Sequence, residues 1–177
     1  MRTLLFLLLV STTLSAQTWK QTLSERLPYL GHRNWIVVVD AAYPAQISAG
    51  IETILCDESQ EKVVKAVIDE LAKTKHVRPV VFLDNELQYV GEKQAPGITD
   101  YRNALNGILS KNKPEVLPHE KIISMLDEAG KTFKVILLKT RLTLPYTSVF
   151  FRLDCGYWTD EAEKELRKAI LSGEINN

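Results

Sequence analysis

The stretch that decides the fold class is WIVVVD at residues 35–40. Its four central residues are all β-branched, a composition typical of a buried strand. Further strands are expected along the chain, at residues 51–55, 79–83, 133–138 and 148–153. Helical patterns lie between these runs, and strands that alternate with helices are typical of the α/β class. We therefore expect a single α/β domain whose mainly parallel central sheet is flanked by helices.

The clearest helix is expected at residues 60–73, where apolar side chains share one face and charged side chains take the other. Other helices are expected at residues 19–28, 101–110, 119–128 and 161–171. Thr159 or Asp160 can cap the last of them. We expect that helix to pack its apolar side chains inward, namely Ala162, Leu166, Ile170 and Leu171.

The first 16 residues have the layout of a secretory signal peptide: a basic tip, an apolar run at residues 4–10 and the small residue Ala16 before Gln17. The alternative, an uncleaved anchor, is disfavoured because a spanning helix needs about 20 apolar residues. We expect an exported protein, periplasmic or secreted, with no stable membrane insertion after cleavage. Residues 17–177 would then form one domain that carries an extra C-terminal helix at about residues 159–172.

The charge balance argues against nucleic acid as a partner. Lys and Arg together number 22, and Asp and Glu also number 22, so the chain lacks the basic excess that nucleic-acid binders need. Two cysteines, Cys56 and Cys155, match no metal or redox motif. Export permits them to form one disulfide, and two buried free thiols are the equal alternative.

Familiar catalytic motifs are missing: the sequence has no GxGxxG, GxxxxGK[ST], HExxH or GxSxG pattern. The three histidines lie too far apart to suggest a metal cluster, and we expect neither a metal nor a cofactor. Asp40 directly follows the first buried strand, where α/β proteins bind ligands. From the pattern alone, the favoured explanation of Asp40 is a turn cap, and that of His32 is a helix cap or a satisfied core imidazole.

Three segments resemble one known family. LGHRNWIVVVDAAYP at residues 30–44 is similar to the opening motif of the D-ribose pyranase and L-fucose mutarotase family, with the same spacing from His32 to Asp40. PYTSV at residues 145–149 resembles the Pro-Tyr-x-Asn segment of that family, and PHE at residues 118–120 resembles its His-Glu pair. The resemblance runs from about residue 23 to residue 157.

The resemblance implies a D-ribose pyranase-like fold and an isomerase that interconverts ring forms or anomers of a free monosaccharide without a cofactor. It implies that His32 is the acid/base and that Asp40 assists it. Tyr146, Ser148 and His119 would bind the substrate. Members of the family assemble as rings in which one subunit completes the site of its neighbour, so we expect a homo-oligomer.

Departures from the family pattern keep two other functions open. Ser148 stands where the family has Asn, and Leu142 stands where it has Glu. A non-catalytic monosaccharide-binding protein on the same scaffold is therefore the alternative. In a third hypothesis, the C-terminal helix docks another protein. The aromatic side chains that could stack on a sugar, or pack in the core instead, are Tyr43, Tyr146, Trp35 and Trp158.

Overall fold

The structure, a computed structural model, describes residues 18–173, so the predicted signal peptide lies outside the described residues. Its centre is a six-stranded sheet with the order β2-β5-β1-β6-β3-β4. The strands are β1 (Trp35–Val39), β2 (Ile51–Leu55), β3 (Val77–Asp84), β4 (Glu115–Leu117), β5 (Val135–Lys139) and β6 (Val149–Cys155). Strand β6 runs antiparallel to both of its neighbours, whereas the other neighbouring pairs are parallel. The predicted α/β class and mainly parallel sheet are confirmed.

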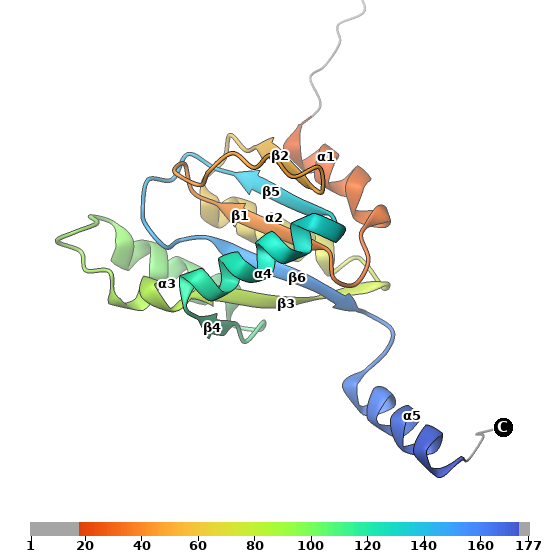
Figure 1. Cartoon of the computed structure of the whole chain (residues 1–177). Helices are drawn as coiled ribbons and strands as arrows, with labels where there is room; N and C mark the ends of the chain where they lie inside the picture. Colours follow the sequence, from red (N-terminus) through yellow and green to blue (C-terminus); the bar gives the residue numbers. More distant parts are fainter. Residues whose placement is uncertain (1–17, 174–177) are drawn as a thin grey trace, which may run out of the picture.

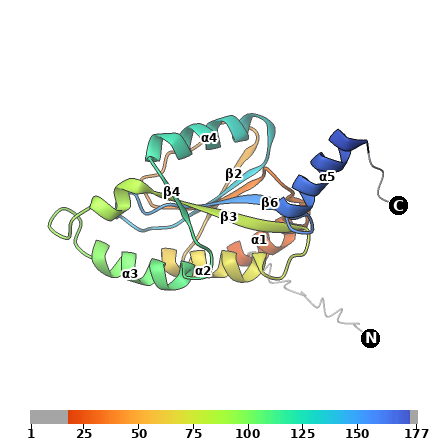
Figure 2. The same cartoon turned by 90° about the horizontal axis from the view of Figure 1, so that it is seen from below.

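Helices cover both faces of the sheet (Figures 1 and 2). One face is covered by α4 (His119–Thr132). The other is covered by α1 (Trp19–Arg26), α2 (Gln60–Leu71) and α3 (Ile98–Leu109). Two short 3-10 helices, η1 (Leu27–Tyr29) and η2 (Asn85–Tyr89), follow α1 and β3. Pro28 lies at the start of η1, where a proline ends the preceding α-helix.

The sheet separates two apolar clusters because side chains of a strand alternate between its faces. In β1, Val37 and Val39 pack with Ile122 and Leu126 of α4. Ile36 and Val38 point the other way and belong to the larger cluster, which includes Val63, Val67 and Leu105 of α2 and α3. Every residue of β1 is buried, which accounts for its uninterrupted β-branched sequence.

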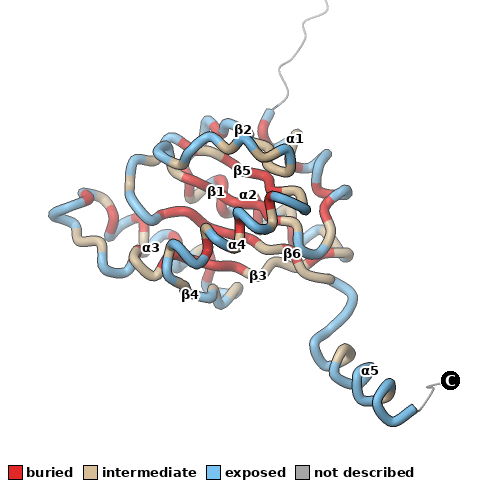
Figure 3. Tube along the Cα trace, in the orientation of Figure 1, coloured by how far each residue is buried: buried red, intermediate tan, exposed pale blue. Residues whose placement is uncertain are grey.

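The last helix, α5 (Asp160–Ser172), contradicts one prediction. Figures 1 and 3 show it extending away from the body, and none of its residues is buried. Leu166 is 41% exposed, Ile170 61% and Leu171 89%, so the expected inward packing is wrong. The physical reason is that no helix or strand among the described residues lies beside its apolar stripe. Thr159 caps it as expected, because its hydroxyl accepts a hydrogen bond from the Ala162 amide.

The two cysteines are free, so the disulfide alternative is not realised. Cys56 follows the carboxyl end of β2, and Cys155 ends the antiparallel β6, which places them at opposite ends of the sheet. Burial raises the pKa of the Cys56 thiol to about 12. Within residues 18–173, no helix combines the length and apolar character that crossing a bilayer requires.

Candidate functional site

A pocket of about 360 Å³ lies at the carboxyl ends of β1 and β3 and the start of β6. Four residues predicted to form the site line it together: Asp40, His119, Tyr146 and Ser148. They come from segments that are far apart in the sequence, and the sheet order brings them together. A volume of this size is within the range of pockets for small ligands.

Strand alternation explains why these side chains share one face. Phe82 and Phe150 pack on the α4 side of the sheet. Asp84 and Ser148 each lie two residues from one of these phenylalanines, so they point to the same side. Helix α4 begins at His119 and crosses this face, which brings the imidazole over the Asp84 carboxylate.

Asp84 and His119 form the most unusual pair in the pocket. The His119 Nδ1 atom lies 3.2 Å from the Asp84 Oδ1 atom, and the Asp84 side chain is completely buried whereas that of His119 is 31% exposed. Apart from this contact, neither Asp84 oxygen has a hydrogen-bond donor among the described residues. Burial raises the pKa of Asp84 to about 6, and the neighbouring His119 only partly offsets that rise. A buried carboxylate without amide or hydroxyl donors is costly to the fold and typical of functional sites.

Glu86 fixes the position of His119. Its two carboxylate oxygens accept hydrogen bonds of 3.2 and 3.0 Å from the His119 backbone amide at the first residue of α4. Pro118, the preceding residue, offers no side-chain cap, so Glu86 fulfils that role from η2. The main chain that carries the imidazole is therefore anchored to the segment that directly follows Asp84.

The ring of Tyr146 contacts that of His119 in the pocket. The two rings meet edge to face with centroids 5.5 Å apart. Tyr146 has a φ of 56°, a left-handed conformation that is uncommon for a residue other than glycine. Its neighbour Thr147 is fully buried, and the Thr147 carbonyl accepts hydrogen bonds from Gln60 at 2.6 Å and Tyr101 at 2.7 Å.

Asp40 combines the two roles that its sequence position allowed. One carboxylate oxygen caps the following turn by accepting a 2.8 Å hydrogen bond from the Ala42 amide, and the residue also lines the pocket. Tyr43 lines the pocket nearby. Burial, with smaller contributions from Asp127 and Asp84, raises the pKa of the Tyr43 phenol to about 12, so the hydroxyl remains a hydrogen-bond donor at neutral pH.

His32 does not join this pocket within one chain. It is exposed in the turn before β1, whereas Asp40 follows the other end of that strand. Five residues of β1 at about 3.3 Å each separate them by roughly 16 Å or more. Of the predicted stacking residues, Tyr43 and Tyr146 line the pocket, whereas Trp35 stacks on Phe82 in the core. Trp158 lies beside α5, where its indole donates to Glu163.

The pocket is equipped for proton transfer between a bound hydroxyl compound and an imidazole. Within the part of the chain that the structure describes, no group of three or more His, Cys, Asp or Glu side chains is placed to hold a metal ion. Asp84 was not predicted as a site residue from the sequence. The available signal was the same as for Asp40, an aspartate that directly follows an apolar strand, but no motif pointed to it.

No family model and no curated protein matches the sequence. Solved structures do match. RbsD of Bacillus subtilis, complexed with D-ribose, is 18% identical, with a TM-score of 0.54 over 79% of this chain and 96% of that chain. The fucose mutarotase of Streptococcus pneumoniae, in complex with L-fucose, is 19% identical, with a TM-score of 0.50 over 78% and 93%. FucU of Bifidobacterium longum is 15% identical, with a TM-score of 0.50 over 75% and 93%. The predicted resemblance is thereby confirmed at the level of the fold: this chain has the fold of RbsD and of the fucose mutarotase.

Proposed function

We propose that the protein is a cofactor-independent isomerase that interconverts ring forms or anomers of a free monosaccharide. The observation that carries the proposal is the buried Asp84 carboxylate, which contacts the partly exposed His119 in a pocket lined by hydroxyl-bearing and carboxylate side chains. The fold of proteins solved with D-ribose and L-fucose supports a sugar as ligand. The predicted signal peptide extends the proposal to a site of action outside the cytoplasm.

Ring opening of a sugar requires two proton transfers. A base removes the proton of the anomeric hydroxyl, an acid protonates the ring oxygen, and the bond between that oxygen and the anomeric carbon breaks as the carbonyl forms. Reclosure from another hydroxyl, or onto the other face of the carbonyl, gives the new ring form and returns both protons. Imidazole suits this exchange because its ordinary pKa lies near neutrality.

His119 and Asp84 fit the base and its orienting partner. Asp84 faces Nδ1, so an ionised Asp84 favours the tautomer in which Nδ1 carries the proton and Nε2 is free to accept one. Asp84 is ionised above a pH of about 6. Tyr146 and Ser148 would hold sugar hydroxyls, and the Asp40 oxygen not used by the Ala42 amide would accept from another.

His32 enters the proposal through a neighbouring copy. The imidazole is exposed and too far from the pocket of its own chain, so a homo-oligomer must bring it to the pocket of a neighbour. In that arrangement, His119 and the neighbour's His32 flank the bound sugar and divide the roles of base and acid. A protein that is strictly monomeric under assay conditions and fully active would contradict this part of the proposal.

One observation favours the alternative of a sugar-binding protein without catalysis. Ser148 is only 3% exposed, and its short hydroxyl offers a ligand fewer hydrogen-bonding atoms than the Asn of the family pattern. The two functions differ in one measurable respect: a binding protein saturates with sugar but leaves the rate of ring-form exchange at its spontaneous value.

Saturation-transfer NMR on a panel of free sugars tests both. The mature protein should accelerate exchange between ring forms of at least one sugar, and His119→Gln should remove most of that acceleration. His76→Gln serves as the matched control, because His76 contacts the Leu30 carbonyl and lies outside the pocket. Line broadening without faster exchange would establish the binding protein. If no sugar in the panel shows either faster exchange or line broadening, the proposal is overturned.

A further inference from the structure

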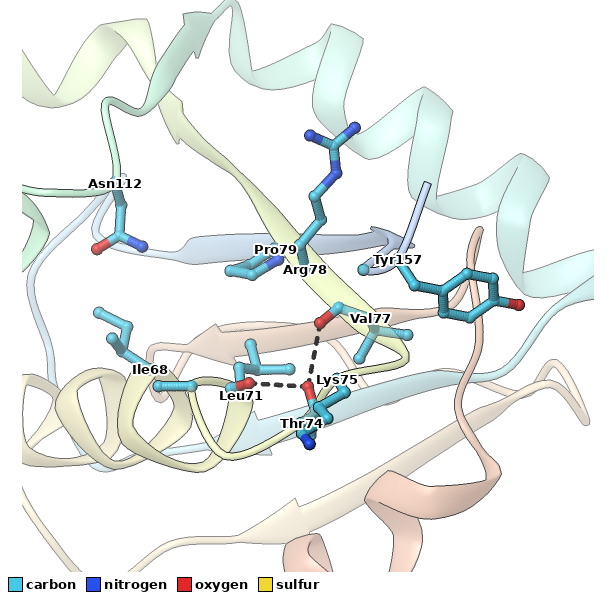
Figure 4. Close-up of a pocket in the computed structure, with 11 residues that line it drawn as sticks. Ile68, Leu71, Thr74, Lys75, Val77, Arg78, Pro79, Asn112 and Tyr157 are labelled. Carbon is cyan, nitrogen blue, oxygen red and sulfur yellow. Dashed lines mark hydrogen bonds between the residues drawn. The ribbon is translucent and has the colours of Figure 1, made fainter. Parts of the chain in front are cut away.

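A second groove lies along the free edge of β3, remote from the proposed sugar site. Strand β4 pairs only with Phe82–Asp84, so within the described part of the chain the first half of β3 has no neighbouring strand on that side. Figure 4 shows the groove between this edge, the end of α2 and Tyr157. Its volume is about 580 Å³, and its apolar side chains include Ile68, Val77 and Pro79.

The same chain carries a helical face that no other element of residues 18–173 covers. Ala162, Leu166, Ala169 and Ile170 follow one another at the spacing of a single stripe along α5. Leu166 and Ile170 are 41% and 61% exposed. An amphipathic helix of this kind gains most of its stability by burying its apolar stripe against a partner. The exposed stripe therefore indicates a contact made outside the single chain.

Three contacts hold α5 away from the groove of its own chain. Gly156 is packed so closely that a Cβ atom there would lie 2.6 Å from the Lys75 carbonyl oxygen, which fixes the path of the chain as it leaves β6. Arg78 then bridges Asp154 at 2.8 Å and Asp160 at 2.9 Å, across the connection to α5. These contacts direct the helix outward, as Figures 1 and 2 both show. An α5 that fills the groove has to come from another copy.

Charge also matches the helix to the groove. The charged residues that line the groove, Lys75 and Arg78, are both basic. The residues that flank the apolar stripe of α5 include Glu163 and Glu165. No ion pair among residues 18–173 involves Lys75 or Glu165, so each is available to a neighbour. The helix as a whole has four acidic and three basic residues, a balance that does not favour an anionic lipid surface.

We propose that α5 of one copy packs its apolar stripe into the β3-edge groove of a second copy, and that the second copy returns the same contact about a two-fold axis. A helix laid in an apolar groove is a recurring mode of recognition. The groove and the base of α5 share Tyr157, so one two-fold axis beside them allows both contacts at once. This contact is independent of the proposed sugar chemistry.

Light scattering over a dilution series of the full mature chain provides the first test. Leu166→Asp should raise the dissociation constant of the assembly about tenfold or more, because it places a charge in the buried stripe. Leu171→Asp is the matched control: Leu171 lies on the opposite face, is 89% exposed and should change nothing. A wild-type monomer, or equal effects of the two substitutions, would overturn the proposal.

A disulfide trap identifies the occupant of the groove. In a Cys155→Ser background, a copy with Ile170→Cys is mixed with a copy that carries Ile68→Cys, and oxidation should link the two chains. When both cysteines are placed in one chain at high dilution, a disulfide within that chain would show that α5 occupies its own groove and would refute the exchange. Co-sedimentation with phosphatidylglycerol vesicles that is lost in Leu166→Asp, without any link between chains, would assign the stripe to lipid instead.

Discussion

Replacing Asp84 by Asn should make the fold more stable while it removes the proposed activity. The pKa of Asp84 lies near 6 because the carboxylate is buried, against an ordinary value of 3.8. That difference corresponds to about 3 kcal/mol by which the ionised form weakens the folded state at neutral pH. Asn has nearly the same shape and no charge. The amide protons of Asn also lack partners in the pocket, so a gain of about 1–3 kcal/mol is expected.

The pH dependence identifies the cause. A carboxyl whose pKa is raised from 3.8 to about 6 by folding costs little near pH 4, where it is protonated in the folded state and about half protonated in the unfolded chain, and its cost is nearly complete above pH 6. Thermal unfolding should therefore give nearly the same Tm for wild type and Asp84→Asn at pH 4. At pH 7 the Tm of the variant should exceed that of wild type by roughly 2–4 °C for each kcal/mol of stability gained. The exposed Asp127→Asn is the matched control and should show no such divergence.

Two results would refute this reasoning. A Tm for Asp84→Asn that is lower than wild type at pH 7 would show that the carboxylate is a structural partner of His119 and not a strained site residue. An equal stabilisation at pH 4 and pH 7 would show that charge is not the cause. In the exchange assay the same variant should lose most of its acceleration of ring-form exchange. The neutral amide lacks the negative charge by which Asp84 favours the Nδ1-protonated tautomer of His119.

Three further substitutions test the scaffold, each by chemical or thermal unfolding. Gly107→Ala should stabilise the protein by about 0.5–1 kcal/mol, because Gly107 is helical and a Cβ there meets nothing within 4 Å; unchanged or lower stability would contradict this. Gly50→Ala should destabilise it strongly, since the Cβ would lie 2.7 Å from the Phe133 carbonyl oxygen, and a neutral effect would show that the two segments can separate. Gln60→Ala should lower the stability of the fold by about 1–3 kcal/mol, because it leaves buried hydrogen-bonding groups unpaired. It should also slow the exchange of sugar ring forms. An unchanged exchange rate would show that Tyr146 does not depend on this contact.

The sheet was predictable because β1 and nearly all of β5 consist of uninterrupted apolar residues. Residues 35–39 and 135–138 are buried on both faces, so nothing polar breaks their pattern. Strand β4 was missed for the opposite reason. It has three residues, Glu115 and Val116 are exposed, and it exists only because the end of β3 offers it hydrogen bonds. The packing of α5 was mispredicted because an amphipathic stripe shows that a partner is needed without saying which chain supplies it.

The site was only partly predictable because its members meet through the sheet order. The family resemblance pointed to Asp40, His119, Tyr146 and Ser148, and the structure gathers these four around one pocket. It also pointed to His32, whose catalytic role stays a prediction that depends on a second copy. Asp84 escaped notice because its significance lies in burial and in the lack of donors, and neither property is visible in a linear pattern.

The conformation of Tyr146 is determined from the far side of the sheet. Its left-handed backbone costs about 1–3 kcal/mol in isolation, so other contacts must stabilise it. Those contacts come from Gln60 and Tyr101, which donate to the Thr147 carbonyl, while Thr140 donates to Gln60 at 2.8 Å. All of these groups are buried, so the network is set before any ligand arrives. The phenol beside His119 is therefore held in place in advance, and a sugar that binds there does not have to bear the entropy cost of ordering this segment.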